Sequence, residues 1–153
     1  MIKINIISRN KSWHNYFKSP KRYIKKKEKL LNKNFKKYKK KSIIFTLLLS
    51  NNAEIKKLNR KFRKKNKITD ILSFPFYNKR TLDKKLVNEK EIYLGDVIVN
   101  LNEVKNKSNF NKFKLEFDKL WIHGLVHLFG YDHKNVKDYI KMIKVEKKFL
   151  SYV

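Results

Sequence analysis

The stretch HGLVHLFGYDH, residues 123–133, is the most informative segment of this chain of 153 residues. It contains three of the four histidines of the protein. His123 and His127 are four residues apart, which places them one turn apart on the same face of a helix. Gly130 is expected to end this helix, because glycine readily adopts the left-handed conformation found at helix C-termini. The chain can then turn back and bring His133 beside the other two histidines.

Three imidazoles with an open fourth position are typical of a catalytic zinc site rather than a closed structural one. The spacing therefore predicts one Zn²⁺ per chain, bound by His123, His127 and His133 on a zincin-like helix. Metzincin proteases share this spacing, but they carry glutamate, their general base, directly after the first histidine. Here that position is Gly124. We expect zinc chemistry without proteolysis of the usual kind.

Composition indicates a soluble globular protein. Hydrophobic residues make up 41% of the chain, enough to form a core despite 35% charged residues. Cysteine is absent, which excludes disulfides and thiolate metal ligands. Residues 1–6 alternate like a strand instead of forming the apolar run of a signal peptide, and the longest apolar run, 43–49, is too short to cross a bilayer. We expect a cytoplasmic protein without membrane association, forming a single domain over residues 1–153.

The net charge of +27, with a pI near 10.2, would attract polyanions, of which nucleic acid is the usual one. A bias toward Lys, Asn and Ile, as in an A+T-rich coding sequence, would produce the same charge. Arginine, which suits bidentate phosphate recognition, occurs only at positions 9, 22, 60, 63 and 80. The charge is therefore compatible with RNA binding without establishing it, and the few arginines are more informative than the many lysines.

The periodicity of apolar residues predicts four strands and four helices. The strands are expected at 2–6, 43–49, 71–76 and 92–99, and the helices at 20–40, from a cap at 50–52 through Phe62, at 112–129 and at 136–150. Pro75 cannot donate to a strand ladder, so the strand 71–76 belongs at a sheet edge. The lysine-rich segment 78–90 is predicted to be an exposed loop. The fold class is α+β, with a single mixed β-sheet of about four strands packed with helices.

Apolar side chains mark the inner faces of the later helices. They are Ile55, Leu58 and Phe62, with Asn59, on the second helix, Phe113, Phe117 and Leu120, with Gly124, on the third, and Val136, Ile140, Ile143, Phe149 and Leu150 on the last.

Taken together, four motifs resemble the YbeY endoribonuclease (rRNA maturation factor) family. They are the histidine stretch 123–133, LNRKFR at 58–63 followed by TDILSFP at 69–75, LGDVI at 94–98, and Glu146, which falls where the family has a glutamate. The resemblance covers roughly residues 43–150, and the N-terminal third agrees only in layout. The lysine content and the segment 78–90 depart from the family pattern.

This resemblance implies a zinc-dependent, single-strand-specific endoribonuclease that acts in 16S rRNA 3′-end maturation and in ribosome quality control. The implied partners are RNA, including rRNA of the small ribosomal subunit, and ribosome-associated proteins. Two alternatives remain: a ribosome-assembly factor whose RNA binding matters more than hydrolysis, and a zinc hydrolase of another substrate, which Gly124 disfavours.

Chemistry at such a site requires a nucleophile and a cation. Zinc held by neutral imidazoles can lower the pKa of bound water toward ~7, or it can polarise a phosphoryl oxygen or help to deprotonate the RNA 2′-hydroxyl, and the sequence leaves these routes open. Phosphodiester cleavage builds negative charge that a nearby cation stabilises. The family motif assigns this catalytic role to Arg63 beside the three histidines, with Arg60 as its local competitor. We predict that Arg63 lines the cleft of the histidines, with the strand 71–74 as one wall.

Several other residues near the motifs also have expected roles. Asp132 could orient a ligand imidazole or merely form a turn. Other expected roles are loop capping for Thr69 and Asp70, a turn at Asp96, a position facing the substrate groove for Ser73, and a core position rather than a base-stacking one for Trp121.

Overall fold

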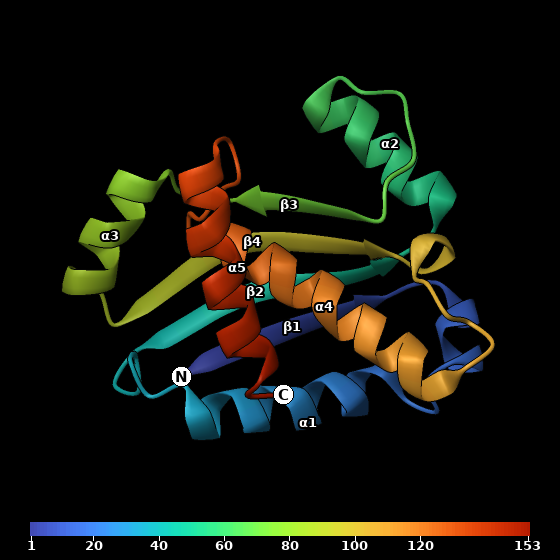
Figure 1. Ribbon diagram of the computed structural model, residues 1–153, viewed down its shortest axis with the longest axis horizontal. Helices are drawn as coiled ribbons and strands as arrows, with labels where there is room; N and C mark the ends of the chain where they lie inside the picture. Colours follow the sequence, from blue (N-terminus) through green and yellow to red (C-terminus); the bar gives the residue numbers. More distant parts are fainter.

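The computed structural model describes residues 1–153, and its elements alternate between strands and helices before ending in two helices (Figure 1). In chain order they are β1 (Ile2–Ser8), α1 (Pro20–Asn34), β2 (Ser42–Ser50), α2 (Asn52–Arg63), β3 (Ile71–Pro75), α3 (Lys79–Asn88), β4 (Glu91–Asn100), α4 (Phe110–Leu128) and α5 (Val136–Leu150), with 3₁₀ turns at Lys11–Asn15 and Leu101–Glu103. None of the helices is long and apolar enough to span a membrane.

The four strands form one mixed sheet in the order β1-β2-β4-β3. β1 and β4 both run parallel to β2, whereas β3 pairs antiparallel with β4. The expected α+β class with a single mixed sheet is confirmed. β3 ends at Pro75 and lies at a sheet edge, as the missing backbone donor of proline predicted.

One face of the sheet carries the main hydrophobic core. Alternate residues of β2 point to this face, where Phe45 and Leu47 are fully buried. α1, α4 and α5 contribute to the same core, and α4 supplies three of its five largest fully buried side chains, Phe113, Phe117 and Trp121. The opposite face is covered only in part, by α2, whose Ile55 packs in a small cluster with residues of β3 and β4. α4 is therefore held against the centre of the sheet over much of its length.

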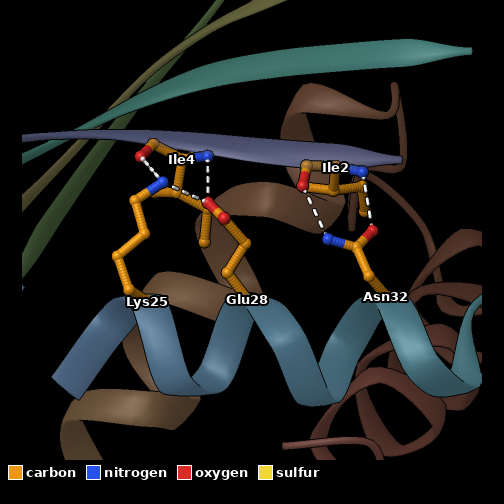
Figure 2. Close-up of polar contacts among 5 residues, drawn as sticks. All are labelled: Ile2, Ile4, Lys25, Glu28 and Asn32. Carbon is orange, nitrogen blue, oxygen red and sulfur yellow. Dashed lines mark hydrogen bonds and ion pairs between the residues drawn. The ribbon is translucent and has the colours of Figure 1, made fainter. Parts of the chain in front are cut away.

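The outer edge of β1 is closed by polar side chains of α1 rather than by another strand (Figure 2). The Asn32 amide accepts from the backbone N–H of Ile2 and donates to its carbonyl, with both distances 2.7 Å. Glu28 accepts the N–H of Ile4 at 2.6 Å, and Lys25 donates to the carbonyl of Ile4 at 3.1 Å. Because these groups are satisfied, the first half of this sheet edge, at Ile2 and Ile4, offers no template for pairing with another strand.

Two predictions about helices were wrong. The segment 78–90 contains helix α3 instead of a loop; the Asn78 side chain caps it, and Leu82 and Leu86, one turn apart, are buried. The first helix ends at Asn34, six residues before the expected end.

The inner faces of α2 and α5 were also predicted only in part. Phe62, Val136 and Ile140 are 58%, 75% and 48% exposed. α5 is instead anchored by Met142 and Phe149.

Candidate metal centre

Helix α4 places the histidines by packing very closely on the sheet at Gly124. A Cβ atom at this position would lie 2.5 Å from Val97 Cγ1 and 3.0 Å from Ile71 Cδ1. A longer side chain has no room there. The position that holds the general base in metzincins thus faces a strand in this protein, which explains physically why no glutamate stands there.

The helix ends as the sequence predicted. Gly130 adopts a left-handed φ of 81°, its N–H bonds to the carbonyl of His127 at 2.8 Å, and the next N–H, of Tyr131, bonds to the carbonyl of Val126. This turn reverses the chain and brings His133 back to the helix.

His123, His127 and His133 converge on one point. Their candidate ligand atoms all lie within 4.8 Å of one another. The ring of His133 is centred 5.3 Å from that of His127 and 6.1 Å from that of His123. His133 is exposed and its imidazole makes no hydrogen bond, whereas the other two rings are half-buried. The group is thus a three-nitrogen site with one open side.

Glu146 and the carbonyl of Tyr131 determine which nitrogen of each helical histidine carries the proton. His123 Nδ1 lies 2.5 Å from Glu146 Oε1, and His127 Nδ1 lies 3.0 Å from the Tyr131 oxygen. A carboxylate and a carbonyl only accept, so each Nδ1 donates and each Nε2 keeps its lone pair. The two Nε2 atoms are 3.0 Å apart. Two lone pairs so close repel each other unless a cation lies between them, which is what a metal site provides.

The electrostatics keep the His127 ring neutral. Burial lowers the pKa of His127 below its ordinary value, and the neighbouring His123 lowers it further. Neutral imidazole is the form that binds a metal ion, so the surroundings of this ring favour coordination at neutral pH.

Arg63 stands at the end of α2, beside the edge strand β3. Its Nη2 atom donates to the carbonyl oxygen of Ser73 at 2.9 Å, and its guanidinium lies 5.6 Å from the centre of the Phe74 ring. The helix of the histidines also packs on β3, through the close approach of Gly124 to Ile71. Both arginines are exposed, but Arg60, unlike Arg63, makes no hydrogen bond. Arg63 and the helix that carries His123 and His127 therefore both contact β3, but Arg63 makes no hydrogen bond with a histidine, and its place in their cleft stays a prediction.

Asp132 forms a turn. Its Oδ1 accepts the backbone N–H of His133 at 2.8 Å, and this bond is the main cause of its lowered pKa. No imidazole contacts this carboxylate, so the role of orienting a ligand belongs to Glu146 instead.

The remaining candidates have structural roles. Asp70 accepts from the N–H of Ile71 and from Thr69 Oγ1, as expected for loop capping. Asp96 does not form the expected turn: it lies within β4 and accepts from the Tyr93 hydroxyl at 2.6 Å. Ser73 is 7% exposed and offers its carbonyl, not its hydroxyl, to Arg63. Trp121 is fully buried, as expected of a core residue.

Sequence reasoning did not assign the two groups that orient the histidines. Glu146 had only its place in the family pattern as a signal, because its partner lies 23 residues away on another helix. Nothing in the sequence pointed to the Tyr131 carbonyl, because every residue type has a backbone oxygen.

Comparison with known proteins identifies relatives along nearly the whole chain. The family model described as Endoribonuclease YbeY matches residues 7–153. The protein named Endoribonuclease YbeY of Pelagibacter ubique is 42% identical over 156 residues, covering 100% of this chain and 97% of the relative. That of Ehrlichia canis is 35% identical, covering 99% of this chain and 92% of the relative. A solution structure of a Thermotoga maritima protein matches with a TM-score of 0.59 and 27% identity, over 98% of this chain and 88% of the other.

Proposed function

Because the chain belongs to the endoribonuclease YbeY family, we propose that this hydrolase of RNA is a zinc-dependent endoribonuclease specific for single strands. The observation that carries the proposal is the convergence of three histidines, with the Nε2 atoms of two of them 3.0 Å apart. Such a donor set suits zinc, which accepts three imidazoles and leaves a position open in catalytic sites.

In this proposal His123, His127 and His133 hold the ion. Zinc bound in this way supplies Lewis-acid chemistry and acidifies water near neutral pH. Glu146 keeps the His123 ring in the required tautomer and orientation, and the Tyr131 carbonyl does the same for His127. The exposed third histidine leaves the site open on the side from which RNA would enter.

Arg63 is the proposed catalytic cation. One of its N–H groups is used by the Ser73 carbonyl, which leaves other donors of the guanidinium for a phosphate. A guanidinium fixed before the reaction stabilises the negative charge that develops on a phosphodiester in its transition state. Arg60 lacks such an anchor.

The biological setting follows from family membership and charge. We propose that the substrate is rRNA of the small ribosomal subunit, with roles in 16S 3′-end maturation and in ribosome quality control. A cytoplasmic location, ribosome-associated protein partners and a single endoribonuclease domain over residues 1–153 belong to the same proposal. The charge of +27 would favour binding to ribosomal RNA.

The same charge supports one further candidate, an assembly factor that binds RNA and hydrolyses little of it. A cleavage assay distinguishes the two. Purified protein is incubated with a labelled single-stranded fragment of small-subunit rRNA, with chelator, without it, and with zinc restored after chelation. We expect cutting to stop with chelator and to return with zinc, while RNA binding persists throughout. Binding without cutting by the zinc-loaded protein would favour the assembly factor, and cutting that ignores the chelator would refute the metal mechanism.

A further inference from the structure

A cavity of about 180 Å³ lies beside the loop that leads to His133. Four separate segments line it: the turn after α1, the helices α3 and α5, and the loop after α4. Aromatic rings dominate its wall, and they are Phe35, Tyr38, Phe129, Tyr131 and Phe149. None of these residues is a candidate metal ligand or contacts Arg63, and only Tyr131, through its backbone carbonyl, takes part in the metal centre.

The rings are arranged as a floor with two accessible sides. Phe129 and Phe149 are 5% and 3% exposed, so they form the floor. Tyr38 and Tyr131 are half-buried and line the cavity. Tyr38 is nearly parallel to Phe129, with an angle of 15° and centroids 6.1 Å apart. Flat aromatic surfaces of this kind bind unpaired nucleobases by stacking, whatever the base.

Lysines surround the rings. Lys79 Nζ lies 5.6 Å from the centre of the Tyr131 ring, and Lys37 Nζ lies 5.2 Å from that of Tyr38. Lys148 also lines the cavity. The wall has a single carboxylate, Asp83, and it is paired with Lys79 at 2.8 Å. Aromatic rings together with flexible cations that lie over them match the chemistry of a nucleotide, which joins an apolar base to a phosphate.

The cavity is connected directly to the metal centre. The Tyr131 ring lines the cavity while the carbonyl of the same residue accepts from His127 Nδ1 at 3.0 Å. Gly130 packs under Lys79 so closely that a Cβ atom would lie 2.6 Å from Lys79 Cδ. A nucleotide in the cavity would therefore touch the loop that holds His133, only a few bonds from the metal ligands.

We propose that this cavity is a subsite for one unpaired nucleobase of an RNA strand, with Lys37 and Lys148 contacting the adjoining phosphates. The choice of RNA as ligand rests on the proposed function. A base in a duplex is stacked on both faces and paired along one edge, so only a single strand can place a base in the cavity. The subsite thus gives a physical origin for single-strand preference that is separate from the chemistry at the metal.

The test uses RNA that contains one 2-aminopurine, a fluorescent base whose emission falls when it stacks. The full-length protein is titrated with this RNA in the presence of chelator, so that no strand is cut. We expect quenching for a single strand and none for the same sequence in a duplex. Tyr38→Leu should abolish the quenching and weaken binding about fivefold or more, since base stacking on an aromatic ring contributes ~1–3 kcal/mol.

A second pair of variants covers the outcome in which Tyr38→Leu does not fold. Lys148→Gln should weaken binding, whereas Lys147→Gln, which removes the same charge from the neighbouring position of α5 outside the cavity, should weaken it less. Equal weakening of RNA binding by Lys148→Gln and Lys147→Gln would overturn the subsite. So would unchanged quenching in a folded Tyr38→Leu protein. Because the readout is binding, RNA that is bound and quenched but never cut by zinc-loaded protein would refute the proposed function and leave the subsite intact.

Discussion

At the scale of single residues, Glu146 is the side chain on which the geometry of the metal centre most depends. It accepts the Nδ1 proton of His123 and so leaves Nε2 free, pointing at the partner histidine. Such outer partners raise the basicity of a ligand and hold its ring in place. Arg63 is positioned comparably, by the Ser73 carbonyl and the Phe74 ring. Both residues are useful targets because their contacts can be removed without emptying the core.

Replacing Glu146 by alanine should weaken zinc binding by about 10- to 100-fold, because the His123 ring loses its orienting acceptor. Competition with a chromogenic chelator measures this affinity. Glu116→Ala is the matched control, since Glu116 is a carboxylate on the ligand helix whose partner is Lys119 and not a histidine. Equal zinc affinity for the Glu146 variant and the wild type would show that the contact has no orienting role.

Replacing Arg63 by alanine should slow RNA cleavage more than replacing Arg60, with zinc content unchanged in both variants. The physical reason is that only Arg63 is anchored, and an anchored cation stabilises a developing charge better than a mobile one. Single-turnover cleavage together with metal analysis checks this expectation. Equal slowing by both substitutions would indicate a general effect of charge.

At the scale of elements, features encoded by neighbouring residues in the sequence were predicted well. Features that depend on packing against distant segments were not. The ligand helix and its end at Gly130 are encoded within a few residues, and the edge position of β3 follows from Pro75 alone. α3 was missed because its only buried apolar residues, Leu82 and Leu86, stand among lysines and polar residues. The exposure of Val136 depends on which elements pack against the first turn of α5, and no local pattern in the sequence contains this information.

The candidate site likewise contains residues that local spacing predicted and a contact that depends on packing between helices. Histidine spacing identified the three converging imidazoles, whereas the contact of Glu146 with His123 arises from the packing of α5 on α4. Asp132, next to a ligand in sequence, was a reasonable candidate for that role, yet its carboxylate is used by the backbone of the turn.

The closed edge of β1 leads to a prediction about stability. Asn32→Ala would leave the N–H and the carbonyl of Ile2 without partners, which should reduce the free energy of unfolding by about 1–3 kcal/mol. Urea denaturation measures this change. Asn111→Ala, at an exposed asparagine near the start of α4, is the control and should change stability far less. A negligible loss for Asn32→Ala would show that water replaces the amide at little cost.

At the scale of the whole molecule, the dominant property is a net charge of +27, whose lysines and arginines lie almost entirely on the helices and loops. A charge this diffuse attracts RNA without selecting where it is cut. Selection would then come from the metal centre, Arg63 and the aromatic cavity, which act over short distances.

This division of roles predicts different salt dependences for binding and for chemistry. RNA affinity should fall steeply with salt, with each phosphate contact adding about −0.7 to the log–log slope for single strands. Single-turnover cleavage at saturating RNA should change far less, because groups covered by substrate are poorly screened. Both are measured from low to moderate salt on the same RNA. An RNA affinity that does not change with salt would show that the many lysines result from compositional bias and do not contribute to RNA recognition.

The central claim is that His123, His127 and His133 bind one catalytic zinc ion, and X-ray absorption at the zinc edge tests it most directly. The measurement is made on wild-type protein loaded with zinc and dialysed, beside His127→Ala treated in the same way. We predict one equivalent of zinc per chain, with imidazole nitrogens at about 2.0–2.1 Å, and loss of this zinc in the variant. Wild-type protein that retains no zinc, or a variant that keeps the same zinc spectrum, would contradict the claim.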